Sequence, residues 1–93
     1  MLPAEDALRL GLVNYVVKPD ELMNKCLEIA EKIKQQAPVA IAEIISCVND
    51  CYSEKKDGFA SEVNSFGKCF STEDYKEGTT AFLEKRKAAF KGK

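Results

Sequence analysis

The sequence predicts an all-α fold, a small bundle of about four main helices preceded by a short helix and a strand-like stub. Apolar residues recur at steps of three and four through most of the chain, and polar breaks containing Gly or Pro separate the periodic segments. Only residues 12–17 form a β-branched and aromatic run, and no second strand is present to pair with it. We therefore expect one helical domain over residues 1–93, with the leading helix and stub at 1–17 and the helices at 20–93.

The first helix and the start of the second follow from local signals. Pro3 and the two acids after it suit a first helical turn, and Gly11 suits the residue that ends that helix. Pro19 biases Lys18 away from helical angles, so a second helix is expected from Asp20, which is a plausible N-cap.

Three further helices follow in the same way. Pro38 ends one helix and begins the next, whose apolar stripe is wide enough to be packed on two sides. A polar break at 54–58 precedes an aromatic seam, and Ser71 or Thr72 caps the last helix. We expect that helix to carry one continuous face as far as Phe90 and to end in a basic tail. The seam residues are Phe59, Val63, Phe66 and Phe70.

Composition excludes several classes of protein. A net charge of −1 with 45% hydrophobic residues excludes a disordered acidic tail and a general nucleic-acid binder, and no apolar run is long enough to span a membrane. We expect a protein of the cytoplasm. The four cysteines are expected to be reduced, half-buried thiols, because they lie among apolar residues of predicted helices and no secretory signal precedes them. They are not expected to bind a metal, because histidine is absent and no second pair has zinc-site spacing.

The residues offer little for catalysis. The chain has no histidine, no Gly-rich phosphate loop and no Gly-x-Ser-x-Gly turn, so acid–base chemistry would rest on carboxylates. Two pairs have suitable spacing, Glu43 with Asp50 and Glu73 with Glu77, but helical spacing places both on polar faces. We expect these carboxylates to remain ionised near their ordinary pKa values, and we assign no catalytic residue and no metal ligand.

Two segments resemble a known family. Residues 70–90 (FSTEDYKEGTTAFLEKRKAAF) look like the end of an enoyl-CoA hydratase of the crotonase family, and residues 4–17 (AEDALRLGLVNYVV) are similar to the helix, turn and strand after its catalytic core. The resemblance covers nearly the whole chain but only about the last third of the family's usual length. It implies the C-terminal helical region without the α/β spiral core, which carries the catalytic glutamates and the oxyanion hole. A chain of this kind is expected to be inactive alone.

The resemblance also implies two binding residues. In the family, C-terminal helices form a trimerisation layer, and an aromatic residue and a lysine contact the nucleotide part of coenzyme A held by another subunit. These positions match Phe66 and Lys85. An aromatic face can pack on adenine and an ammonium can meet a phosphate. The alternatives stay open: Phe66 can be a core residue of the aromatic seam, and Lys85 can be a solvated lysine near a helix C-terminus.

Three functions are therefore considered. The first is the oligomerising, coenzyme-A-covering part of an enoyl-CoA hydratase, which in the full-length family hydrates 2-enoyl-CoA in fatty-acid metabolism. No cofactor is expected to bind tightly, and the partners would be a crotonase core or further copies in a trimer or dimer. The second is a standalone self-associating helical module, because loss of the core should expose apolar residues such as Ile41, Ile44, Phe59 and Phe66. The third is a small binder of coenzyme A or acyl-CoA.

Overall fold

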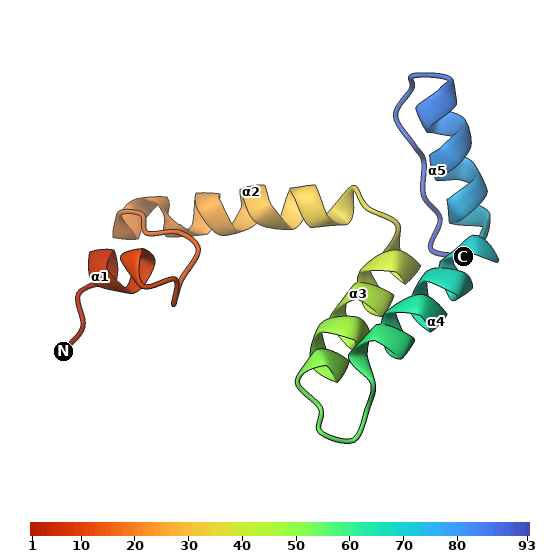
Figure 1. Cartoon of the computed structure of the whole chain (residues 1–93). Coiled ribbons are helices and arrows are strands. Elements are labelled where there is room, and N and C mark those ends of the chain that lie inside the picture. Colours follow the sequence, from red (N-terminus) through yellow and green to blue (C-terminus); the bar gives the residue numbers. More distant parts are fainter. The chain divides into compact units, whose positions relative to one another are not determined.

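The computed structural model describes all 93 residues and contains helices but no β-strand. The elements in order are α1 (Ala4–Arg9), the 3₁₀ turn η1 (Pro19–Glu21), α2 (Leu22–Lys34), α3 (Pro38–Cys51), α4 (Gly58–Phe70) and α5 (Glu73–Leu83) (Figure 1). The all-α class and the four main helices are confirmed. None of the helices combines the length and apolar character needed to cross a bilayer.

The chain divides into two compact units, residues 1–31 and 32–93, with the boundary inside α2. The expectation of one domain over 1–93 is not tested by this division and stays a prediction. Each unit has its own local contacts. In the first, the ammonium of Lys25 lies 4.5 Å from the centroid of the Tyr15 ring, a cation–π contact that holds α2 against the segment before it.

Two expectations for the first unit need correction. Residues 12–17 are irregular and form no strand, because nothing in the chain offers them a β-ladder. Asp20 is not an N-cap: it lies within η1, where Pro19 occupies the first position and Lys18 is the cap. The end of α1 is as predicted, with Gly11 in the left-handed region at φ 73°.

The second unit is built on an antiparallel pair of helices, α3 and α4, and α5 continues from the end of α4 (Figure 1). Pro38 begins α3 as predicted. Asp57 caps α4 by accepting hydrogen bonds from the amides of Phe59 and Ala60, and Thr72 caps α5 by accepting from the amide of Tyr75. These caps satisfy amides that the first turn of a helix leaves without partners.

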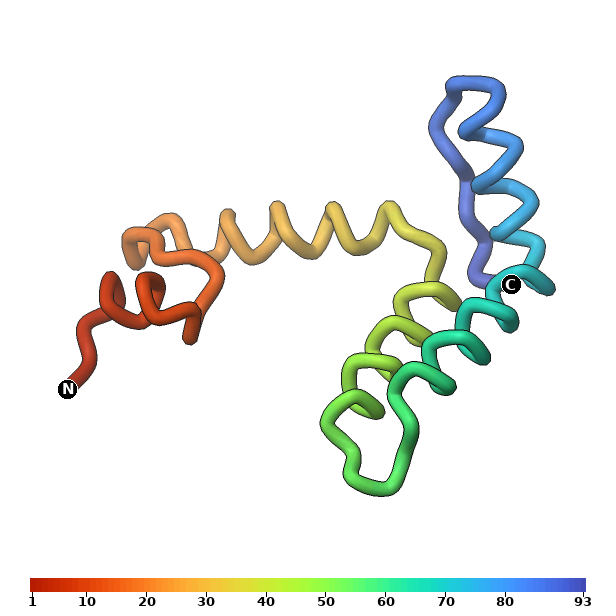
Figure 2. The backbone as a smooth tube through the Cα atoms, viewed as in Figure 1, coloured from red at the N-terminus to blue at the C-terminus, as the bar shows by residue number.

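The last helix is shorter than the sequence suggests. It ends at Leu83, and the chain reverses so that its final residues run back beside α5 (Figure 2). We call residues 86–93 the strap. Phe90 lies on the strap and not on the helix face where periodicity placed it, and its ring packs where a Cβ on Gly78 would come within 3.3 Å. A side chain at 78 would therefore press on the strap.

Very little of the chain is fully buried. Only Ala81, Ser65 and Asp74 are buried, and most of the large apolar residues of α3 and α4, among them Ile44, Val48, Phe59 and Phe66, are more than half exposed. The wide stripe of α3 was expected to pack on two sides, but α4 is the one helix that makes extensive contact with α3. All four cysteines are free thiols. Cys47 and Cys69 are half-buried as expected, whereas Cys26 and Cys51 are exposed because the faces that carry them are uncovered.

Candidate functional site

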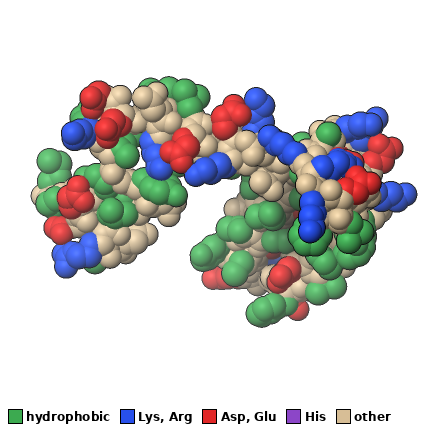
Figure 3. All heavy atoms as spheres, turned by 90° about the horizontal axis from the view of Figure 1, so that it is seen from above, with side chains coloured by type: hydrophobic (Ala, Val, Ile, Leu, Met, Phe, Trp, Pro, Cys, Tyr) green, Lys and Arg blue, Asp and Glu red, His purple; other side chains and the backbone are tan.

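An apolar groove runs along the surface of the α3–α4 pair. Its volume is about 420 Å³, and its lining combines aliphatic and aromatic side chains with two thiols and the polar residues Glu43, Glu62 and Ser65. Figure 3 shows hydrophobic side chains gathered on the exposed surface of the chain. Its apolar part is formed by Ile44, Cys47, Val48, Phe66 and Cys69 together with Ala40.

Phe66 stands on this groove with most of its side chain in solvent. It is 65% exposed, and its ring meets that of Phe70 edge to face at a centroid distance of 4.9 Å. The Phe70 ring in turn packs on the Tyr75 ring, with a centroid distance of 4.3 Å. The reading of Phe66 as a buried core residue is therefore wrong for this chain, and its ring face is open to a partner or ligand.

The carboxylates beside the groove are more constrained than expected. The Glu43 side chain is 21% exposed and lies 3.4 Å from the ammonium of Lys68, and the Asp50 side chain is 14% exposed and lies 2.9 Å from that of Lys56. A hydrogen bond from Ser65 lowers the pKa of Glu43, helped by Lys68, and a hydrogen bond from Lys56 lowers the pKa of Asp50. The expectation of ordinary pKa values fails for both because each carboxylate accepts hydrogen bonds from neighbouring side chains, which outweigh the opposing effect of partial burial.

The C-terminus of α5 forms a Schellman motif. The amide of Arg86 donates to the carbonyl of Ala81 at 3.0 Å, and the amide of Lys85 donates to that of Phe82 at 3.2 Å. In this motif the first residue after the helix cap adopts a left-handed conformation, and that residue is Lys85, with φ 55°. It is the one non-glycine residue in the chain with positive φ. Lys85 is thus an exposed lysine directly after the C-terminus of α5, as the solvated-lysine alternative expects, and its side chain leaves the backbone from a left-handed turn.

The same motif ends α1, where glycine fills the equivalent position. The amide of Leu12 donates to the carbonyl of Ala7 at 2.9 Å, and that of Gly11 donates to Leu8 at 3.0 Å. Glycine adopts the left-handed region without the steric cost that a Cβ brings. Lysine at position 85 therefore accepts a conformational penalty that glycine at position 11 avoids.

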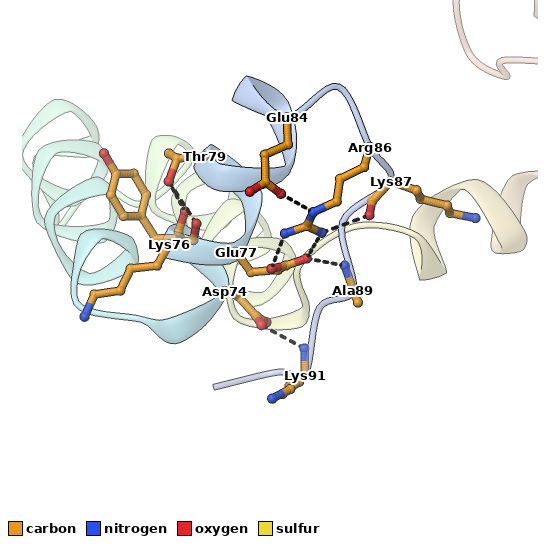
Figure 4. A network of polar contacts seen from close by, with 10 residues as sticks. Asp74, Lys76, Glu77, Thr79, Glu84, Arg86, Lys87, Ala89 and Lys91 are labelled. Atoms are coloured by element: carbon orange, nitrogen blue, oxygen red, sulfur yellow. Dashed lines mark hydrogen bonds and ion pairs between the residues drawn. The ribbon is translucent and has the colours of Figure 1, made fainter.

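Charged contacts hold the strap beyond this turn (Figure 4). Both oxygens of Glu77 accept from the Arg86 guanidinium, at 2.6 and 3.0 Å, and one of them also accepts from the amide of Ala89 at 2.8 Å. Arg86 also donates to Glu84 at 2.6 Å. The bonds from Arg86, and then that from Ala89, lower the pKa of Glu77 to about 2.

Asp74 fastens the end of the strap by main-chain contacts. It is only 3% exposed, and its two carboxylate oxygens accept from the amides of Lys91 and Gly92, each at 2.7 Å. Its own amide donates to the carbonyl of Lys93 at 2.9 Å. Gly92, at φ 79°, lies against the ring of Pro38 at the start of α3. The strap therefore connects both ends of α5 and reaches α3.

The structure keeps the two candidate binding residues on separate features. Phe66 lines the α3–α4 groove, whereas Lys85 lies at the turn after α5 and does not line that groove. Their binding roles stay predictions. Chemically, the site offers an open aromatic face and a cation on a fixed turn, while Glu43, Asp50 and Glu77 are held ionised and are poor proton donors at neutral pH.

Comparison with known proteins identifies the family. The family model for enoyl-CoA hydratase/isomerase matches residues 1–93. The chain belongs to this family. It is 51% identical over 89 residues to the short-chain-enoyl-CoA hydratase of Clostridium acetobutylicum, covering 92% of this chain and 33% of that protein. It is 43% identical over 91 residues to the crotonyl-CoA hydratase of Syntrophomonas wolfei, covering 97% of this chain and 35% of that protein.

Solved structures agree with the fold. The enoyl-CoA hydratase of Bacillus anthracis superimposes with a TM-score of 0.88 at 34% identity, over 97% of this chain and 35% of that one. The enoyl-CoA hydratase of Mycobacterium tuberculosis superimposes with a TM-score of 0.86 at 32% identity, over 99% of this chain and 37% of that one. This enoyl-CoA hydratase/isomerase chain thus spans about a third of the length of the curated relatives it matches.

Sequence reasoning missed the strap and its two carboxylates. One signal was available, because a glycine in the middle of a helix, here Gly78, often marks the close approach of another segment. No comparable signal marked Lys85, since the residues around it are good helix formers.

Proposed function

We propose that the chain is the C-terminal helical part of an enoyl-CoA hydratase, which covers the coenzyme A portion of the substrate and joins subunits, and which has no hydratase activity alone. One observation carries the proposal. A chain that spans a third of its relatives exposes a continuous apolar face on α3 and α4, including Ile44 (57%), Phe59 (83%) and Val63 (71%). Faces of this kind mark surfaces that pack against protein.

The names of the relatives support a role in holding coenzyme A and not in choosing the reaction. A methylmalonyl-CoA decarboxylase of Escherichia coli is 36% identical to this chain, and a carnitinyl-CoA dehydratase of Salmonella arizonae is also 36% identical. What these proteins share with the hydratases, by name, is a coenzyme A thioester. We infer that this third of the protein recognises that common part, with Phe66 on the adenine and Lys85 on a phosphate.

The remaining features of the proposal are predictions of the same kind. The substrate would be a 2-enoyl-CoA, no group would be bound permanently, and the assembly would be a trimer or dimer that includes a catalytic core. A cytoplasmic location and a place in fatty-acid metabolism belong to the same proposal.

The test is to graft the chain onto a catalytic core. The matching 89 residues of the Clostridium acetobutylicum short-chain-enoyl-CoA hydratase are replaced by this chain, and hydration of a short 2-enoyl-CoA is measured. We expect an active chimera, while the isolated chain and the relative truncated at the same point are both inactive. A folded but inactive chimera, or hydration by the isolated chain, would contradict the proposal.

The second candidate, a standalone self-associating helical module, rests on the same exposed face. Light scattering across a hundredfold range of concentration, with and without coenzyme A, separates the two. Discrete oligomers that ignore coenzyme A, together with an inactive chimera, favour the module. Saturable binding of coenzyme A by a monomer favours the third possibility, a small coenzyme A binder.

A further inference from the structure

The left-handed turn at Lys85 costs the chain conformational free energy. A non-glycine residue in the left-handed region costs free energy that glycine at the same position does not. Lys85 is exposed, and its ammonium has no hydrogen-bond or ion-pair partner in the structure, so nothing local to its side chain offsets that cost. Contacts made by neighbouring residues must therefore stabilise this turn.

The contacts next to the turn supply that stabilisation. Arg86 directly follows Lys85, and its guanidinium is bound in a two-pronged arrangement by Glu77, two turns back along α5. Paired hydrogen bonds between an arginine and a carboxylate fix orientation as well as distance. The amide of Arg86 also donates to the carbonyl of Ala81, and the amide of Glu84 donates to that of Thr80, so the residues on both sides of Lys85 are tied to α5.

Glu77 does more than pair with a charge. The same oxygen that accepts from Arg86 accepts from the amide of Ala89, so one carboxylate holds both the start and the middle of the strap. Glu84, by contrast, meets only Arg86 and no strap amide. The two glutamates therefore have different roles although both pair with the same guanidinium.

We propose that Glu77 is a positioning residue for the ligand contact of Lys85: by fastening Arg86 and Ala89 it holds the left-handed turn that aims the Lys85 ammonium at a phosphate of the coenzyme A nucleotide. This inference rests on the proposed function, which gives Lys85 that contact. Glu77 itself touches no substrate. Its effect on binding is entirely through the geometry of the turn.

The first measurement uses the full 93-residue chain. Hydrogen exchange of the amides of Ala89, Lys91 and Gly92 is compared in the wild type, Glu77→Gln and Glu84→Gln. We expect Glu77→Gln to speed exchange at Ala89 by about tenfold or more, with a smaller effect in Glu84→Gln and no change in the amides of α3 and α4. Equal exchange at Ala89 in all three proteins would overturn the positioning role of Glu77. Loss of protection throughout α3 and α4 would overturn it too, because Glu77 would then have a general structural role.

The second measurement uses the chimera described above. The quantity is the ratio of kcat/KM for a 2-enoyl-CoA to kcat/KM for the matching enoyl-pantetheine thioester, which lacks the nucleotide. Lys85→Ala and Glu77→Gln are each expected to lower this ratio, by about threefold to tenfold. Glu77→Gln is expected to add nothing once Lys85 is alanine, because both act through one contact.

The outcomes separate the two proposals. If Lys85→Ala leaves the ratio unchanged, the nucleotide contact of the proposed function is wrong, and the inference that rests on it is wrong as well. If Lys85→Ala lowers the ratio but Glu77→Gln does not, the proposed function stands and the positioning role fails. A further fall in the double variant would also overturn it, since Glu77 would then act independently of Lys85.

Discussion

Replacing Lys85 with glycine should stabilise the second unit, although it removes a charged side chain from a helix terminus. Lys85 has φ 55° at the position of a Schellman motif that glycine normally fills. A left-handed conformation costs a non-glycine residue about 1–2 kcal/mol. Glycine also makes the unfolded chain more flexible, which costs about 0.4–1 kcal/mol. The net gain is therefore about 0.5–1 kcal/mol.

This gain is measurable by thermal unfolding. A change of 1 kcal/mol moves the Tm of a small domain by about 4–8 °C, so Lys85→Gly is expected to raise Tm by about 2–8 °C in far-ultraviolet circular dichroism. Lys85→Ala removes the same charge but keeps the strain, and its Tm should stay near that of the wild type. Lys87→Gly is the matched control, because residue 87 lies outside the left-handed region and can only lose stability.

The first unit offers the reciprocal experiment. Gly11 occupies the same position of the same motif, so Gly11→Ala should destabilise the end of α1 by about 1 kcal/mol. The reasoning is refuted if Lys85→Gly lowers Tm as much as Lys87→Gly does. That result would mean that the Lys85 side chain contributes to folding more than the turn costs.

Three further predictions concern the strap and the groove. The pKa of Glu77 is lowered to about 2 from an ordinary value of 4.5. Its contribution to stability is therefore complete above pH 4.5 and is lost as the pH falls toward 2. Glu77→Gln should remove this pH dependence from the exchange rate of the Ala89 amide. Asp74→Ala leaves two partly buried amides without an acceptor and should cost about 2 kcal/mol in denaturant unfolding, more than the exposed control Glu73→Ala. Phe66→Ala should change the Tm of the isolated chain little, because Phe66 is 65% exposed, but should weaken self-association in light scattering more than Lys85→Ala does; a large fall in Tm would contradict this.

Much of the fold could be predicted because its boundaries are set by local chemistry. Pro38 at the start of α3, Thr72 as the cap of α5 and Gly11 at the end of α1 each act on backbone groups within a few residues. Such signals are present in any short window of sequence. The helices, and most of their ends, follow from them.

The end of α5 could not be predicted in this way. Residues 84–88 are good helix formers, and what stops the helix is a set of contacts across nine to eighteen positions of sequence, from Glu77 to Arg86 and from Asp74 to Gly92. The two acids of the first turns of α5 were visible, but as exposed or dipole-favoured charges. Their role depends on where a later segment lies.

The candidate site shows a second kind of limit. Periodicity identified Phe59, Val63 and Phe66 as one apolar face of α4, and that face exists. Periodicity says only that a face is apolar and not whether the same chain covers it. The residues were therefore identified correctly while the burial of Phe66 was left open, and only the structure shows that its ring is exposed.

The way Asp74 holds the end of the strap has a consequence for how freely this tail can change in sequence. All three hydrogen bonds at Asp74 join it to main-chain atoms of residues 91–93, and none involves their side chains. These hydrogen bonds therefore depend little on which side chains occupy positions 91–93. Lys91 and Lys93 can be exchanged for residues of other size or charge without loss of a bond, whereas proline at 91 or 92 removes a donor. Selection on the tail can act on its surface charge while one buried aspartate keeps it in place.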